Sequence, residues 1–242
     1  MTVFKKYSAV YDLLYKDKDY EKEAQHIVEI LQKYGVNQGF SILNLGCGTG
    51  RHDHILAQMG YKMTGVDMSE EMVRIACKGE KSFAPTFFTG DIRTIDLNRK
   101  FDAVISLFHV MSYQNSDDDV TAVFNNVYRH LNKNGIFVFD CWYADAVLAE
   151  RPEKRVKVVE DDEFLVTRHA KPEMHEEKRI VDVNYEIQVT EKTTGIAEIF
   201  RETHNMRYFS VNEIKKFAES AGFEMISHKI NGWNLEVVVG KV

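Results

Sequence analysis

The stretch that decides the fold is Ile42-Leu43-Asn44-Leu45-Gly46-Cys47-Gly48-Thr49-Gly50. It begins with a short apolar strand, predicted over residues 41–45, and a helical pattern starts at Thr49. Glycine has no Cβ and tolerates positive φ, so a ligand can lie directly on the backbone. Three glycines within five residues are more than a tight strand–helix turn requires. We therefore interpret this glycine loop as a ligand-binding loop.

The loop differs from two common phosphate-binding patterns. Arg51 stands where the dinucleotide fingerprint GxGxxG has its third glycine, and no GK[ST] sequence follows to make a P-loop. Asp67, at the end of the second predicted strand, can accept hydrogen bonds from both hydroxyls of a ribose. Asp91, after the third, can accept one from the exocyclic amine of adenine, with Met68 and Ile92 on either side of the ring.

Each aspartate alone could be an ordinary helix cap or turn residue. The carboxyl ends of parallel strands meet at one edge of a sheet, however, and ligands bind there in open α/β sheets. Three such features in this order therefore indicate an adenosine-binding site.

Strands and helices alternate on both sides of the glycine loop, which predicts a parallel sheet with helices on both faces. The predicted strands are 41–45, 62–66, 86–89, 101–106 and 136–141, and the predicted helices are 20–34, 49–59, 69–78 and 117–131. Between Pro152 and Arg207 the pattern changes to alternating polar and apolar residues, which predicts an inserted antiparallel sheet. A helix over 210–221 and strands over 223–229 and 235–239 then complete the α/β domain.

Composition excludes several classes of protein. The chain has 242 residues, 44% of them hydrophobic, and a net charge of −6, which is typical of a globular domain and unsuited to nucleic acid. No apolar run approaches the roughly 20 residues of a membrane helix, so we expect a cytoplasmic protein with neither nucleic acid nor membrane as a partner. Three cysteines without a CxxC spacing predict free thiols, and His52, Asp53 and His54 do not share a helix face, so no metal site is expected.

The motif series resembles that of class I S-adenosylmethionine-dependent methyltransferases. The residues that carry the resemblance are Leu45–Gly50, Gly65-Val66-Asp67-Met68-Ser69, Gly90-Asp91-Ile92 and Phe101-Asp102-Ala103-Val104. The resemblance implies a doubly wound, seven-stranded, mostly parallel sheet whose last strand is antiparallel. It also implies S-adenosylmethionine as cofactor, held by Gly46, Cys47, Gly48, Gly50, Asp67, Met68, Asp91, Ile92 and Leu107.

Two further stretches bear on the cofactor's surroundings and on the methyl acceptor. Tyr11 and Tyr15 lie one helical turn apart and could form a lid over the cofactor with an aromatic face toward the sulfonium, or simply pack on the domain. His109 and Tyr113 follow the fourth predicted strand, where the methyl group should lie. We predict that one of them steers or deprotonates the acceptor, although a lone histidine is often structural.

Three further segments resemble the N-methyltransferases of nucleotide-linked amino sugars, of the desosamine and mycaminose type. They are Tyr11–Tyr20, Gly46–His52 and His204-Asn205-Met206-Arg207-Tyr208-Phe209-Ser210. The resemblance implies an amino group on a nucleotide-linked sugar as acceptor, and a homodimer. The sequence departs from that family at Tyr113, where its dimethyltransferases usually have histidine.

We expect Tyr7, Arg168, Arg179 and Arg207 to bind the substrate, because a diphosphate requires cations. The predicted domains are 1–150 with 208–242, which bind the cofactor under an N-terminal helical lid, and 151–207, which binds substrate, mediates dimerisation, or does both. Two alternatives stay open: O-methylation of a small-molecule hydroxyl or carboxylate, and a non-catalytic protein that binds S-adenosylmethionine.

Overall fold

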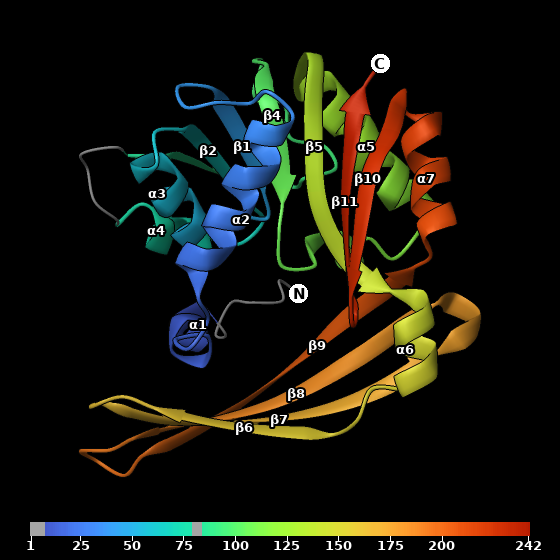
Figure 1. Cartoon of the computed structure of the whole chain (residues 1–242). Coiled ribbons are helices and arrows are strands. Elements are labelled where there is room, and N and C mark those ends of the chain that lie inside the picture. Colours follow the sequence, from blue (N-terminus) through green and yellow to red (C-terminus); the bar gives the residue numbers. More distant parts are fainter. Residues whose placement is uncertain (1–7, 79–83) are drawn as a thin grey trace.

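The main sheet fixes the position of every candidate site residue. The computed structural model describes residues 8–78 and 84–242, and within them this sheet has seven strands in the order β3-β2-β1-β4-β5-β11-β10 (Figure 1). Strands β1 to β5 run parallel, whereas β11 is antiparallel to both of its neighbours, which confirms the predicted fold class. The strands are β1 (Ser41–Leu45), β2 (Lys62–Asp67), β3 (Thr86–Thr89), β4 (Phe101–Ser106), β5 (Leu131–Tyr143), β10 (Phe223–Asn231) and β11 (Asn234–Lys241).

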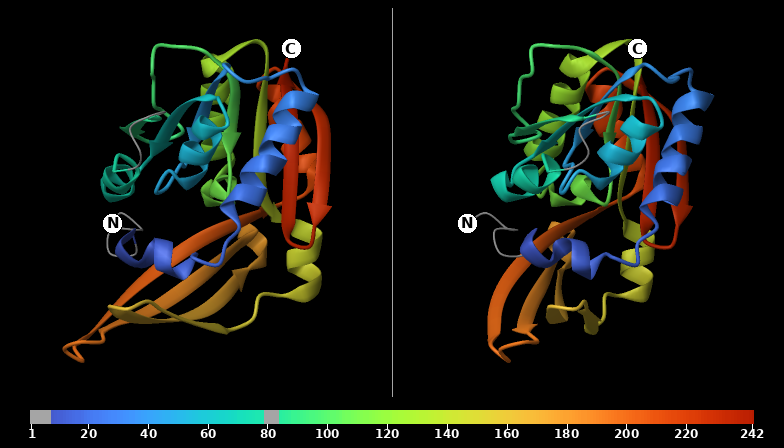
Figure 2. Two further views of the ribbon diagram at one scale, coloured as in Figure 1. Left: turned by 60° about the vertical axis from the view of Figure 1, so that its left-hand side comes forward. Right: turned by 90° about the vertical axis from the view of Figure 1, so that its left-hand side faces the viewer.

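Helices cover both faces of this sheet (Figures 1 and 2). Helices α2 and α3 contribute to the core on one face, and α5 and α7 to the core on the other. Strand β4 explains the continuous apolar pattern, because Ala103 and Ile105 enter the first core while Phe101 and Val104 enter the second. The helices are α2 (Tyr20–Lys33), α3 (Arg51–Gln58), α4 (Glu70–Ala76), α5 (Asp117–His130) and α7 (Val211–Ser220).

The predicted insertion is a second, antiparallel sheet in the order β9-β8-β7-β6. Its strands are β6 (Arg155–Glu160), β7 (Phe164–His175), β8 (Ile180–Glu191) and β9 (Ala197–Phe209). All four are longer than the stretches whose alternation predicts them, residues 156–159, 164–168, 181–189 and 196–203, because pairing continues where the alternation fades, as at Pro172 opposite Val183. At its end β9 joins the main sheet, where Tyr208 lies beside Trp142 of β5.

Helix α1 (Ser8–Leu14) lies between the second sheet and the glycine loop (Figure 2). Leu14 is fully buried in a small core on that sheet, and Lys157 Nζ donates to the Leu14 carbonyl at 2.6 Å. On the other side Asp12 Oδ1 accepts from Thr49 Oγ1 at 3.0 Å. The last turn of the helix therefore contacts both parts of the molecule.

The remaining helices are short: α6 (Ala144–Glu150) and the 3₁₀ turns η1 (Val110–Tyr113) and η2 (Glu176–Lys178). Within residues 8–78 and 84–242, no helix is both long enough and apolar enough to cross a bilayer.

Candidate functional site

The glycine loop connects β1 to α3 and forms one wall of a cavity of about 630 Å³. Gly46 has φ 80°, and a Cβ built there would lie 2.5 Å from Val110, so only glycine fits. Gly48 has φ 56°, and a Cβ there would meet no atom within 4 Å, so its open side faces cavity space. Gly46, Cys47 and Gly48 line the cavity, whereas Gly50 packs behind it against Phe87.

Asp67 lies beside the glycine loop because β2 pairs with β1. The Gly48 N–H donates to its Oδ2 and the Ser69 N–H to its Oδ1, both at 2.9 Å. Each carboxylate oxygen thus has one fixed donor and keeps lone-pair capacity for a further one. Burial raises the pKa of Asp67, although these two hydrogen bonds act in the opposite direction. The arrangement suits a neighbouring pair of hydroxyl donors.

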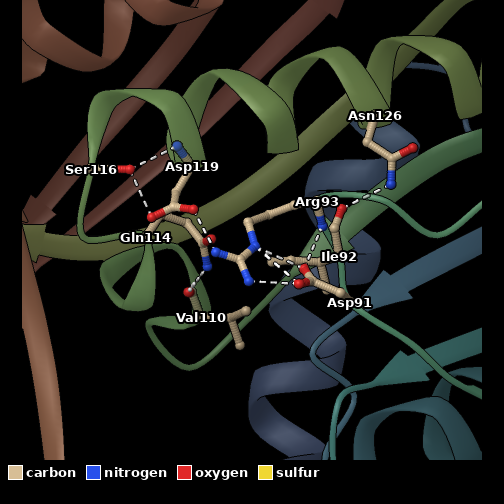
Figure 3. A network of polar contacts seen from close by, with 8 residues as sticks. All are labelled: Asp91, Ile92, Arg93, Val110, Gln114, Ser116, Asp119 and Asn126. Atoms are coloured by element: carbon tan, nitrogen blue, oxygen red, sulfur yellow. Dashed lines mark hydrogen bonds and ion pairs between the residues drawn. The ribbon is translucent and has the colours of Figure 1, made fainter.

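The cavity-lining carboxylate of Asp91 is held by Arg93 (Figure 3). Arg93 Nη2 donates to Oδ2 at 2.6 Å and Nε to Oδ1 at 2.9 Å, and these bonds lower the pKa of Asp91. Arg93 Nη1 also binds Asp119 on the first turn of α5, and Asn126 two turns later donates to the Ile92 carbonyl at 2.8 Å. The segment 91–93 is therefore attached to α5 at two points, with an ionised carboxylate at the cavity wall.

The turn after β4 has an unusual backbone. Phe108 and His109 have φ 66° and 63°, a left-handed region that costs a non-glycine residue about 1–3 kcal/mol. The His109 N–H donates to Asp140 Oδ1 at 2.8 Å, and its Nδ1 lies 3.5 Å from Asp140 Oδ2. Lys18 Nζ lies 3.5 Å from the centre of the Phe108 ring, whose edge contact with Tyr15 spans 5.0 Å between centroids. Residues 107–110 all line the cavity.

The opposite wall comes from the second sheet and η1. Tyr113 Oη lies 2.6 Å from His204 Nδ1, and His204 Nε2 lies 3.4 Å from Glu202 Oε2. Tyr185 packs edge-on against His204, with 4.9 Å between ring centroids. Burial raises the pKa of the Tyr113 phenol well above its ordinary value, so the hydroxyl keeps its proton at neutral pH. The geometry can therefore carry a proton from a cavity ligand through Tyr113 toward His204.

Sequence reasoning gave no role to His204, Tyr185 or Glu202. His204 begins one of the segments that resemble the amino-sugar N-methyltransferases, but the alternation of β8 and β9 identifies strands without telling which face meets the cavity. The sequence signal that could have found these three residues is the alternation of the inserted sheet, because its polar residues must face either solvent or a ligand.

The structure places the other predicted residues as follows. Tyr11 and Tyr15 line the cavity, with Met68, which is 52% exposed, also in its wall. Arg168 Nη1 donates to the Tyr15 hydroxyl at 3.2 Å. Arg179 and Arg207 lie outside the cavity wall, where each donates to Glu213 Oε1 at 2.6 Å. Tyr7 lies outside the described residues.

The three residues considered for a metal point to different partners. His52 Nε2 is 2.8 Å from Glu23 Oε2, His54 Nε2 is 2.9 Å from the Ala76 carbonyl, and Asp53 accepts from Asn44 Nδ2. Among the described residues no group of three His, Cys, Asp or Glu side chains could hold a metal ion. Burial raises the pKa of the Cys47 thiol well above its ordinary value, so this cavity-wall cysteine is a poor nucleophile.

Comparison with known proteins identifies the class. Residues 42–135, which include the glycine loop, Asp67 and Asp91, match the family described as "Methyltransferase domain". The chain contains a methyltransferase domain and has the class I fold, and it is an S-adenosylmethionine-dependent enzyme with S-adenosylmethionine as its cofactor. This confirms the first resemblance.

Individual relatives add to this. The YqeM protein of Bacillus subtilis is 28% identical over 225 residues, which is 92% of this chain and 87% of the relative. The dTDP-3-amino-3,4,6-trideoxy-alpha-D-glucopyranose N,N-dimethyltransferase of Streptomyces venezuelae is 32% identical over 144 residues, 58% of this chain and 59% of that enzyme. The crystal structure of Streptomyces venezuelae DesVI superposes with a TM-score of 0.81 and 25% identity, over 97% of this chain and 98% of that one. The second resemblance, to amino-sugar N-methyltransferases, is thus confirmed as a likeness.

Proposed function

We propose that this methyltransferase methylates an amino group on a nucleotide-linked sugar. The observation that carries the proposal is the two-sided cavity, with the glycine loop and two aspartates on one wall and the Tyr113–His204–Glu202 chain on the other. A site that holds two reactants in register can remove about 7–11 kcal/mol of the barrier to transfer.

The cofactor residues suit an adenosyl group. Asp67 would accept from the ribose hydroxyls, Asp91 from the adenine amine, and Met68 and Ile92 would flank the ring. Gly46, Cys47, Gly48 and Leu107 would contact the methionyl part, with Tyr11 and Tyr15 above. The open side of Gly48 supports this placement, since main chain alone borders the cavity there. The bound cofactor supplies an electrophilic methyl group on a sulfonium.

The opposite wall would handle the acceptor's proton. A protonated amine has no lone pair for the methyl group, and a newly methylated amine must shed a proton. Glu202 favours the His204 tautomer with hydrogen on Nε2, which leaves Nδ1 to accept from the Tyr113 hydroxyl. The Tyr113 oxygen can then take the amine proton while its own proton passes to His204 Nδ1. Glu202 stabilises the imidazolium that forms. His109 stands nearer β4 and would steer the acceptor.

The substrate-binding arginines are revised in this proposal. The cationic side chains of the described cavity wall are already paired, Lys18 with Glu23, Arg51 with Asp12 and Arg93 with Asp91. Arg168 also lies outside the cavity wall, but it donates to Tyr15, which lines the cavity, and would approach a diphosphate there. The predicted homodimer, the cytoplasmic location and the role of residues 151–207 in dimerisation stay predictions.

The test is methyl transfer from S-adenosylmethionine to a dTDP-linked 3-amino sugar, with its 3-hydroxy counterpart in parallel and the product located by tandem mass spectrometry. We expect a methyl group on nitrogen. His204→Gln should lower kcat about 100-fold with unchanged cofactor affinity, because proton transfer is typically worth 10²–10⁴-fold. His175→Gln, which removes a histidine paired with Asp182 at 3.0 Å elsewhere in the same sheet, is the matched control and should be unaffected. Methylation on oxygen, or full activity of His204→Gln, would refute the proposal.

A further inference from the structure

Asp140 hydrogen-bonds to the left-handed turn at Phe108 and His109. It lies on β5, next to the strand that precedes the left-handed pair Phe108 and His109, and its side chain is only 17% exposed. Its Oδ1 accepts the His109 N–H at 2.8 Å. Non-glycine residues seldom adopt this conformation, so two of them in succession persist only where the surroundings impose it.

The turn reaches the glycine loop through its next residue. Val110 follows the left-handed pair, and its two methyl groups lie 2.5 and 2.6 Å from where a Cβ on Gly46 would be. Val110 and the first glycine therefore fit together only while the turn keeps its shape. Phe108, held by Tyr15 and Lys18, depends on the same turn for its place in the cavity wall.

We propose that Asp140 is a positioning residue for this methyltransferase: its carboxylate keeps residues 107–110 in the conformation that shapes the cofactor cavity at the end of β4. This role rests on the proposed placement of the cofactor at the glycine loop. Asp140 is outside the cavity wall, so it would act only through His109 and Val110.

The expected effect follows from the population of the competent turn. If removal of the carboxylate leaves that turn in 1–10% of molecules, the apparent affinity for the cofactor falls by about ten- to a hundredfold. Asparagine keeps an acceptor oxygen of the same shape for the His109 N–H, so Asp140→Asn should stay within about threefold of wild type. Glycine adopts the left-handed region freely, so His109→Gly should recover much of the affinity that Asp140→Ala loses.

The experiment measures S-adenosylmethionine affinity by calorimetry, and hydrogen exchange at the His109 amide without cofactor. The variants are Asp140→Ala, Asp140→Asn and Asp140→Ala with His109→Gly. Asp102→Ala is the matched control, since Asp102 accepts the Ser41 N–H at 2.8 Å at the opposite end of the sheet. We expect lost affinity and lost protection in Asp140→Ala alone, with both retained in Asp140→Asn and the affinity partly recovered in the double variant.

Several results would overturn the role of Asp140: wild-type affinity and protection in Asp140→Ala, no recovery with His109→Gly, or equal loss in Asp102→Ala. If Asp140→Ala does not fold, the S-adenosylmethionine affinities of Asp140→Asn and of the double variant still test the role of Asp140. If wild type binds no S-adenosylmethionine, the proposed cofactor placement fails, whereas hydrogen exchange at His109 still reports whether Asp140 holds the turn.

Discussion

Asp53 gives the protein a pH-dependent stability that can be worked out from its environment. The side chain lies on α3, is fully buried, and accepts from Asn44 Nδ2 at 2.7 Å. Burial raises the pKa of Asp53 from 3.8 to about 7. In the unfolded chain the same carboxyl titrates near 3.8. Between these two values the folded state therefore holds a proton that the unfolded state has lost.

The sign and the size follow. Because the folded state binds more protons, the free energy of unfolding falls as pH rises from about 4 to 7, and the loss is complete above 7. A shift of about three pKa units, at about 1.4 kcal/mol each, corresponds to a loss on the order of 4 kcal/mol. Asp53→Asn keeps the shape and removes the titration. Its free energy of unfolding should match that of wild type at pH 4 and exceed it by several kcal/mol at pH 8.

The assay is urea unfolding followed by circular dichroism at pH values from 4 to 8, with the slope m compared between the two proteins. Wild type and Asp53→Asn should diverge steadily between pH 4 and 7. If the free energies of unfolding of the two proteins run parallel with pH, or if wild type gains on the variant as pH rises, burial does not raise the pKa of Asp53.

Two further variants examine the cofactor wall. Gly48→Ala should cost about 1–2 kcal/mol of stability, because of the left-handed φ, and still fold. Its affinity for S-adenosylmethionine should fall at least about tenfold, because the added methyl group would occupy the open side of the glycine loop. Unchanged affinity in calorimetry would contradict the proposed placement. Arg93→Gln should free the Asp91 carboxylate, weaken adenosylhomocysteine binding about tenfold and reduce the preference for it over the inosine analogue. An unchanged preference would mean that Arg93 does not orient Asp91.

The main sheet could be predicted because its signals are local. The apolar run of β4 indicates a strand buried on both faces, and the glycines after β1 indicate a loop close to a ligand. Asp67 and Asp91 could be placed near that loop because the carboxyl ends of parallel strands share one edge of the sheet. The boundaries of β7 to β9 could not be predicted, since pairing across the sheet extends past the alternating pattern.

The far wall of the cavity depends on contacts that sequence spacing does not reveal. Tyr113 meets His204 across 91 residues, and no local pattern brings them together. Arg207 was expected at the substrate because of its charge, but Glu213 on α7 and Asp117 on α5 neutralise it first. The left-handed turn at Phe108 and His109 could not be predicted either, because the residue that hydrogen-bonds to it, Asp140, lies on another strand.

Strand β9 runs without interruption from Ala197 to Phe209, pairing first with β8 and at its end with β5. The second sheet is thus not a separate body that could swing on a flexible hinge. Helix α1, whose Tyr11 lines the cavity, is attached to the glycine loop and to the second sheet by hydrogen bonds that each involve a side chain. We therefore expect cofactor entry and product release to depend on movement of helix α1 rather than on a hinge between the two sheets.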